Sequence, residues 1–462
     1  MRNLAALLAA LSTVACGPPQ DPDAWQAQSH FRQGQFQDAE TAAQQTLARD
    51  PDNPEMRRLE IDAAIRRGDS ARGVELYMQW HRHRRSYDAK ALRSMAISTL
   101  RRGLVENAPD VRATAVRAIA RARLRQVTGE LLRLLDDPAP QVVVAVVLAV
   151  SERRTWERAT QLAQSGDASA RARLLAGAPR SYRKHLAGAA RTALGDQDGR
   201  VRKAAASAIG RFGLADMQPQ LLQRTTDDSD GSVRAAALRS LTKLGDASVE
   251  PVARKALTDD HLGVRLAALA ALAQRPKANR ALLQQLAHAS DSFLALRAAV
   301  VARRLGYEVP MPTLQLALGH RQWAVRVAAV NALPQLLPER DAVSLLEPLL
   351  TDARIEVRLA TARALVQLGH KSRARPVFIA ALGATTDGPR VQAAIDLLRL
   401  KDDSGRDALT ELARSPAAET RRMAAEAHAY TDNPGLPLVH ALGDADAKVR
   451  LAAAATLLEL LD

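Results

Sequence analysis

The chain has 462 residues, of which 47% are hydrophobic but only 3% are aromatic. Helix-forming residues are abundant and the residues that strands favour are scarce, so the composition predicts an all-α fold and excludes wholesale disorder. The formal net charge is +15, which favours acidic proteins, anionic lipid headgroups or nucleic acid as partners. Basic residues spread over solvated helix faces would give the same charge balance.

The first residues have the order of a secretory signal. Arg2 gives a positive start, and a short apolar run from Leu4 to Leu11 leads through small residues to Cys16. This run is shorter than the roughly 20 apolar residues that span a bilayer. Cys16 is the only cysteine, so no internal disulfide and no site of several cysteines can form. We therefore expect a signal peptide over residues 1–15.

The last residues of this segment, Thr13-Val14-Ala15-Cys16, resemble the lipobox of bacterial lipoproteins. In that family the cysteine becomes the lipidated N-terminus, although Thr13 stands where Leu is usual. The resemblance implies lipidation at Cys16, a linker over residues 16–24 and a lipid as the only membrane anchor. Gly17 in place of Asp implies, under enteric-type sorting, the outer membrane with the protein facing the periplasm. A plain signal peptide with an incidental cysteine is the alternative.

A period of 34 residues begins near Trp25. Gly34 and Gly68 are one period apart, and Pro51 closes the first unit. The pattern resembles the tetratricopeptide repeat, in which a glycine lets paired helices approach and a proline ends the second helix. The resemblance implies two helical hairpins over residues 25–86, followed by a transition helix over residues 87–103.

From residue 104 to residue 462 a different motif recurs, with a mean step of about 31 residues. An acidic residue is followed six positions later by an arginine, usually after a valine, and then by an alanine-rich run. Eight copies keep both charged residues, and degenerate copies bring the total to about twelve units. The eight pairs are Glu106 and Arg112, Asp167 and Arg173, Asp196 and Arg202, Asp228 and Arg234, Asp259 and Arg265, Asp291 and Arg297, Asp352 and Arg358, and Asp444 and Arg450.

One unit, residues 227–245, illustrates how the motif folds. Asp228 and Asp230 can cap the first N–H groups of a helix and suit its positive end. Val233, Leu241 and other apolar residues follow at helical spacing and give one apolar stripe. Gly245 stops the helix before the next one begins. Such a hairpin cannot bury its apolar face alone, so it stacks on its neighbours.

The motif resembles the short HEAT repeat of phycobilin-lyase-like proteins. The resemblance implies a right-handed α-solenoid in which acidic residues and arginines form a ladder between adjacent repeats. We assign this structural role to the eight acid–arginine pairs.

Motifs for catalysis and cofactors are missing from the sequence. It contains no nucleotide-binding or hydrolase signature, and no His-Glu dipeptide of the kind that HEAT-like metal-dependent hydroxylases use. We therefore predict no enzyme activity, cofactor or metal. An enzyme or maturation factor of the bilin-lyase or hydroxylase class remains an alternative. A basic HEAT-like nucleic-acid binder is another, and the expected export of the chain argues against it.

A basic surface is the remaining candidate for function. Positions five and nine after each motif arginine, or after its counterpart in a degenerate copy, should lie on the exposed side of the second helix, which lines the concave face in HEAT-like solenoids. Two of these positions are acidic, Glu152 and Glu459. Seven are basic: Arg117, Arg121, Arg211, Arg239, Lys243, Arg363 and Lys401. The sequence thus predicts a lipid-anchored scaffold that binds acidic protein partners along a basic concave face.

Overall fold

The computed structural model of the chain describes residues 21–84, 87–245, 248–308, 311–432 and 435–462. Every regular element in these residues is a helix, which confirms the all-α class. The expected signal peptide and Cys16 lie outside the described residues. The chain forms two compact units: unit 1 comprises Met1–Ala122 and Ser415–Asp462, and unit 2 comprises Arg123–Arg414.

Unit 1 combines the start of the chain with its end. Its helices are α2 (Pro22–Gln33), α3 (Phe36–Arg49), α4 (Pro54–Arg67), α5 (Ser70–Arg84), α6 (Ala89–Gly103), α7 (Pro109–Arg121), α27 (Ala418–Ala427), α28 (Gly435–Ala441) and α29 (Ala447–Leu461). The first four occupy most of the range expected for tetratricopeptide-like hairpins, and α6 occupies the expected transition segment.

Unit 2 consists of stacked helical hairpins. Its helices are α8 (Thr128–Arg133), α9 (Pro140–Ala149), α10 (Arg153–Ser165), α11 (Ala168–Gly177), α12 (Arg183–Ala193), α13 (Gly199–Phe212), α14 (Gln218–Asp227), α15 (Gly231–Leu244), α16 (Val249–Ala256), α17 (Leu262–Leu272), α18 (Arg280–Leu286), α19 (Ser292–Arg304), α20 (Met311–Leu318), α21 (Trp323–Leu336), α22 (Glu339–Leu346), α23 (Ile355–Gln367), α24 (Lys371–Leu382), α25 (Asp387–Arg399) and α26 (Ser404–Leu412).

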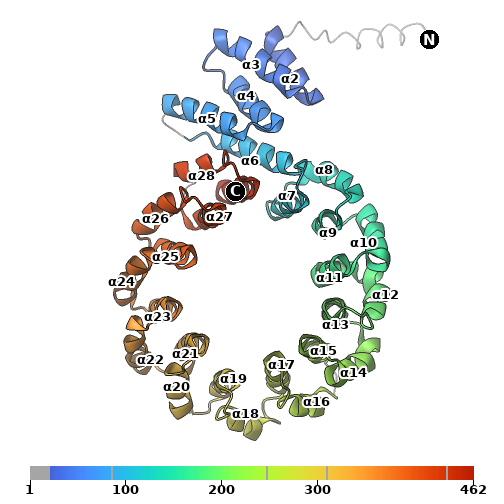
Figure 1. Cartoon of the computed structure of the whole chain (residues 1–462), viewed down its shortest axis with the longest axis vertical. Helices are drawn as coiled ribbons and strands as arrows, with labels where there is room; N and C mark the ends of the chain where they lie inside the picture. Colours follow the sequence, from blue (N-terminus) through green and yellow to red (C-terminus); the bar gives the residue numbers. More distant parts are fainter. Residues whose placement is uncertain (1–20, 85–86, 246–247, 309–310, 433–434) are drawn as a thin grey trace, which may run out of the picture. The chain divides into compact units, whose positions relative to one another are not determined.

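The helices of unit 2 form two rows. The odd-numbered helices, α9 to α25, make the inner row, which lines the concave side of this unit, and the even-numbered helices make the outer row (Figure 1). Successive inner helices such as α11, α13 and α15 pack against one another as well as against the outer row. The exposed side chains of an inner helix therefore face the concave side.

Short side chains at the helix ends set where the helices start. Asp167, Asp198 and Asp230 cap α11, α13 and α15, each accepting a hydrogen bond from a backbone N–H within 2.7–2.8 Å. At the other end of α15, Gly245 has φ +75°, a left-handed conformation that glycine adopts without strain. The expected roles of Asp230 and Gly245 in residues 227–245 are thus confirmed, whereas Asp228 does not cap α15 but accepts from the N–H of Asp230 and from Arg202.

The start of α2 differs from the sequence-based expectation. The helix begins at Pro22, inside the segment 16–24 expected to be a linker. Asp21 caps it by accepting from the N–H groups of Asp23 and Ala24 at 3.0 and 3.2 Å, and proline fits the first turn of a helix.

The two glycines of the tetratricopeptide-like units also act differently from expectation. Gly34 ends α2 and Gly68 ends α4, both in the left-handed conformation with φ of +80° and +111°. No neighbouring atom lies within 4 Å of where a Cβ at Gly34 would stand. Gly34 is therefore required by the turn and not by close approach of two helices.

Small residues bring the inner helices of unit 2 close together. On α13, Ala204, Ala205 and Ala208 are buried. A Cβ on Gly210 would lie 2.6 Å from the hydroxyl of Ser240 on α15, and that hydroxyl donates to the carbonyl of Ala206 at 2.8 Å. The spacing between α13 and α15 is thus fixed by contacts that leave no room for larger side chains.

The last helix of the chain packs on the first HEAT-like helices within unit 1. Helix α29 contacts both α6 and α7. Arg450 donates to Glu106 Oε1 at 3.1 Å although the two residues are 344 positions apart. The first and last HEAT-like repeats are therefore direct neighbours. In the described residues no helix is long and apolar enough to cross a membrane.

Candidate functional site

A basic face extends over three successive inner helices of unit 2. Helices α11, α13 and α15 contain no acidic residue, because each carries its aspartate at the N-cap, just outside the helix. Nine basic residues lie on these helices: Arg171, Arg173, Arg200, Arg202, Lys203, Arg211, Arg234, Arg239 and Lys243. Four of them have solvent-accessible side chains and form no ion pair with any residue that the structure describes: Arg173, Lys203, Arg239 and Lys243. Arg239 is partly buried, and this burial lowers its pKa. We call these four residues the basic face.

The exposed residues follow the helical period. On α13, Lys203 lies one turn before the partly exposed Ser207, and on α15, Arg239 lies one turn before Lys243. The residues between Lys203 and Ser207 are buried alanines, and Ser240 and Leu241 are buried between Arg239 and Lys243, so each of these helices presents a narrow polar stripe. Helical spacing from the motif arginine predicted Arg239 and Lys243 but not Lys203 and Arg173. Arg173 stands at the position expected for a ladder arginine, and Lys203 directly follows the motif arginine, outside positions five and nine.

Arg211 was expected to belong to this surface, but it has a structural contact. Its guanidinium donates to the carbonyl oxygens of Leu175 and Ala176 at 3.1 and 2.8 Å, and to that of Ala178. These carbonyls belong to the end of α11, where the last C=O groups of a helix lack partners within the helix. Burial lowers the pKa of Arg211 below its ordinary value. Arg211 therefore ties α13 to the end of α11.

Two further expected residues are also placed differently. Arg363 on α23 donates to Asp396 Oδ2 on α25 at 2.7 Å, and the Asp396 side chain is only 4% exposed. Lys401 was expected on the second helix of its unit, but α25 ends at Arg399 and Lys401 follows in the left-handed conformation with φ +62°. The expectation for Lys401 was wrong because the helix stops two residues earlier.

The ladder that supports the basic face pairs each arginine with the next repeat. Arg202 donates to Asp228 at 2.8 Å, Arg234 to Asp259 at 2.7 Å and Arg265 to Asp291 at 3.0 Å. The acidic residue six positions before each arginine contributes only its backbone carbonyl, as Asp259 does to Arg265 at 2.8 Å. The ladder is thus confirmed between adjacent repeats, while the pairing of carboxylate and arginine within one repeat was wrong.

In one of the eight pairs the ladder arginine is a different residue: Arg171, not Arg173, pairs with Asp196 at 2.8 Å. Arg421, in a degenerate copy of the motif, likewise pairs with Asp444 of the next repeat at 2.7 Å. Two further arginines of the eight pairs have no carboxylate partner among the described residues: Arg297 is exposed, and Arg358 donates to the backbone carbonyls of Asp352 and Ala353 at 2.6 and 3.2 Å.

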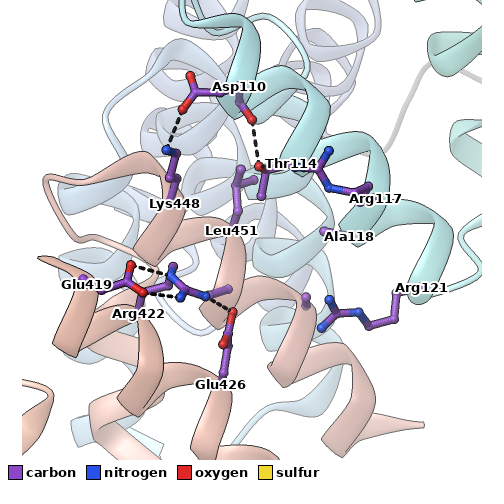
Figure 2. Close-up of a pocket in the computed structure, with 12 residues that line it drawn as sticks. Asp110, Thr114, Arg117, Ala118, Arg121, Glu419, Arg422, Glu426, Lys448 and Leu451 are labelled. Atoms are coloured by element: carbon purple, nitrogen blue, oxygen red, sulfur yellow. Dashed lines mark hydrogen bonds and ion pairs between the residues drawn. The ribbon is translucent and has the colours of Figure 1, made fainter. Parts of the chain in front are cut away.

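Arg117 and Arg121 lie in unit 1, where they line a pocket with residues of α27 and α29 (Figure 2). Both side chains are exposed. They therefore do not belong to the basic face of unit 2.

In the part of the chain that the structure describes, no three His, Cys, Asp or Glu side chains are grouped so that they could hold a metal ion. Buried acidic groups do occur. Asp62 on α4 is buried, which raises its pKa to about 6, and it accepts hydrogen bonds from Ser94 and Ser98 on α6. These contacts join α4 to α6 and so connect the tetratricopeptide-like helices to the start of the HEAT-like part.

Two repeat families match the chain. The model described as HEAT repeats matches residues 157–242, 218–303 and 310–399. The model described as tetratricopeptide repeat matches residues 26–89. Both repeat types were predicted, with the tetratricopeptide-like units before the HEAT-like units along the chain.

Solved structures with similar stretches include CpcE and CpcF of phycocyanin lyase from a Nostoc species, with 20% identity, a TM-score of 0.28 and coverage of 58% of this chain and 92% of that chain. The S. pombe condensin Cnd3–Cnd2 subcomplex shows 16% identity, a TM-score of 0.34 and coverage of 85% and 65%. Karyopherin Kap121p, bound to the extreme C-terminus of the phosphatase Cdc14p, shows 15% identity, a TM-score of 0.32 and coverage of 90% of this chain and 50% of that chain. At these values the likeness says nothing of what this chain binds. No curated protein sequence matches the chain.

Proposed function

The chain belongs to the HEAT-repeat family, whose model matches more than half of it, and from this premise we propose that it is a scaffold that binds acidic segments of protein partners on the basic face of unit 2. The observation that carries the proposal is the absence of acidic residues from α11, α13 and α15, together with four exposed basic residues. Such a surface attracts negative charge, and its surroundings on these helices offer no competing carboxylate.

Acidic protein is favoured over nucleic acid by the lack of stacking groups. The three helices contain one aromatic residue, Phe212, and it is fully buried. Single-stranded nucleic acid is usually bound by aromatic side chains on which its bases stack, combined with a basic groove. The basic face supplies the charge without the stacking groups.

The experiment measures binding of a fluorescent peptide with alternating glutamate and alanine to the whole chain. Wild-type protein should bind it with an affinity that falls as salt rises, because exposed charges are screened within about 8 Å at physiological ionic strength. Each exposed charge contributes about 0.5 kcal/mol, so replacing all four with glutamate should weaken binding by at least about 30-fold. The variant carries Arg173→Glu, Lys203→Glu, Arg239→Glu and Lys243→Glu.

The matched control reverses four exposed basic residues on the outer row, Arg133, Arg183, Lys184 and Lys255. These changes alter the net charge as much as the four substitutions on the basic face do. If binding depends on the basic face, the affinity of the control should stay within about threefold of that of the wild type. Equal losses for the two variants would show that charge acts diffusely and would sink the proposal. Tighter binding of a single-stranded oligonucleotide of equal charge than of the peptide would replace the protein partner with nucleic acid.

We further propose that the scaffold is attached to the cell envelope by a lipid on Cys16, facing the periplasm. The support is the order of the first residues: a positive start, a short apolar run, small residues and then the only cysteine. A lipid chain gives reversible binding to a membrane without a spanning helix. The solenoid would then present its basic face to soluble or membrane-bound partners.

A further inference from the structure

Unit 1 contains a pocket between three of its helices (Figure 2). The cavity has a volume of about 410 Å³ and is bounded by α7, α27 and α29. Ala118, Leu451 and Ala455 give it an apolar floor. Charged side chains stand around this floor on all three helices. This volume lies within the roughly 300–1,000 Å³ that small-ligand pockets usually have.

The carboxylates of the pocket are already paired. Asp110 forms an ion pair with Lys448 at 2.5 Å, and this contact lowers the pKa of Asp110. Glu419 accepts from Arg422 at 2.9 Å and Glu426 accepts from the same guanidinium. The hydrogen bond from Arg422 lowers the pKa of Glu419. Their negative charges are thus largely compensated within the pocket.

Arg117 and Arg121 add positive charge to one wall. They lie one turn apart on α7, and the hydroxyl of Thr114 accepts from Arg117 Nη2 at 2.9 Å. Arg121 forms a long ion pair with Glu459 at 3.9 Å, and the Arg121 side chain is 62% exposed. Like charges one turn apart repel each other, whereas a carboxylate placed between two guanidiniums accepts hydrogen bonds from both. With these two residues the pocket holds four basic and three acidic side chains.

We propose that this pocket binds a carboxylate that carries a small apolar side chain, with the carboxylate between Arg117 and Arg121 and the apolar group on Leu451 and Ala455. Two sources share this chemistry: a free N-acylated amino acid and the carboxyl-terminal residue of a polypeptide. The pocket lies in unit 1 and shares no residue with the basic face, so it is a second site whose test is independent of the proposed function.

The test titrates the full chain by calorimetry with three probes: N-acetyl-leucine, the peptide Ser-Gly-Ser-Leu with a free carboxyl group, and the same peptide as its carboxyl-terminal amide. The free peptide should bind, and the amide should bind at least about tenfold more weakly, because it lacks the charge. Equal binding of N-acetyl-leucine and the free peptide identifies a free acid as a sufficient ligand, while tighter binding of the peptide identifies a chain end. Equal binding of peptide and amide, or no binding of any probe at millimolar concentration, would overturn the proposal.

Variants locate the binding to this pocket. Arg117→Gln with Arg121→Gln should weaken binding of the free peptide at least about tenfold, and circular dichroism should stay unchanged because both side chains are exposed. Ala452→Phe, which places a ring in the pocket, should block binding without removing a charge. Arg183→Gln with Lys184→Gln, two exposed residues on α12 that belong to neither site, is the control and should bind as wild type does. Wild-type affinity of the Arg117 and Arg121 variant would contradict the proposal.

Discussion

Arg202 and Arg200 stand two residues apart at the start of α13, but they sit in different surroundings. Arg202 reaches Asp228 of the next repeat, and the two side chains are 12% and 0% exposed. Arg200 pairs with Asp198 of its own helix cap and is 72% exposed. Removing one member of a buried ion pair leaves an uncompensated charge, whereas an exposed pair contributes little.

Arg202→Ala should therefore lower the free energy of unfolding by about 2–4 kcal/mol. Arg200→Ala should leave it almost unchanged, because its ion pair is exposed to solvent. Burial raises the pKa of Asp228, but hydrogen bonds from Arg202 and from the N–H of Asp230 outweigh it, so its pKa lies below the ordinary value. The stabilisation by this ion pair is therefore fully present above the unfolded-state pKa of Asp228, about 3.9. It is lost as the pH falls through the lower folded-state pKa. Chemical denaturation at pH 7 and pH 3 checks this: equal losses for both variants at pH 7 would refute the ladder as a stabilising device.

At the scale of helices, two helical glycines lie in different surroundings, one against neighbouring helices and one in open space. Gly103 ends α6, and a Cβ there would lie 2.6 Å from a methyl group of Leu451 on α29 and 2.9 Å from Ala115 on α7. Gly188 lies within α12, where a Cβ would meet nothing within 4 Å. Glycine is the weaker helix former, so an alanine that meets no obstacle stabilises a helix.

The two glycines should therefore respond to alanine with opposite signs. Gly188→Ala should raise stability by about 0.5–1 kcal/mol through its better helix propensity. Gly103→Ala should lower it by about 1–3 kcal/mol, because α29 and α7 must move apart to admit the methyl group. Thermal melting of both variants provides the comparison. A stabilised Gly103 variant would show that α6 and α29 are not closely packed.

At the scale of the whole chain, the N-terminal segment decides where the scaffold works. Cys16→Ala should abolish incorporation of a fatty-acid analogue and move the protein from the membrane fraction to the soluble fraction of the cells that make it. An acyl chain binds a membrane because its methylene groups are buried in the bilayer. The lipid is the only anchor that we propose, so its removal should release the protein. A Cys16 variant that stays in the membrane fraction, beside a wild type without an acyl chain, would refute the anchor.

The pairing of charges shows most clearly what one sequence can and cannot specify. The recurrence of an acidic residue and an arginine six positions later predicted repeats, helices and a ladder. It led to Asp259 as the partner of Arg265, whereas the carboxylate that binds Arg265 belongs to Asp291 of the following repeat. A motif records spacing along the chain, and a side chain pairs with whatever the neighbouring repeat brings within reach.

The basic face was predicted in part for the same reason. Helical spacing identified Arg239 and Lys243, because their exposure depends on the stripe of a single helix. The contacts of Arg211 with the end of α11 and of Arg363 with Asp396 cross from one helix to another. No rule of spacing distinguishes such residues from exposed ones.

The sequence by itself determined the all-α class, the two repeat types in their order and the caps that begin and end helices, since each depends on residues within a few positions of one another. Only the tertiary structure decided that Arg450 meets Glu106 and that α7, α27 and α29 enclose a pocket. These contacts join segments that lie about 300 or more positions apart in the sequence, and a pattern that spans one repeat cannot encode them.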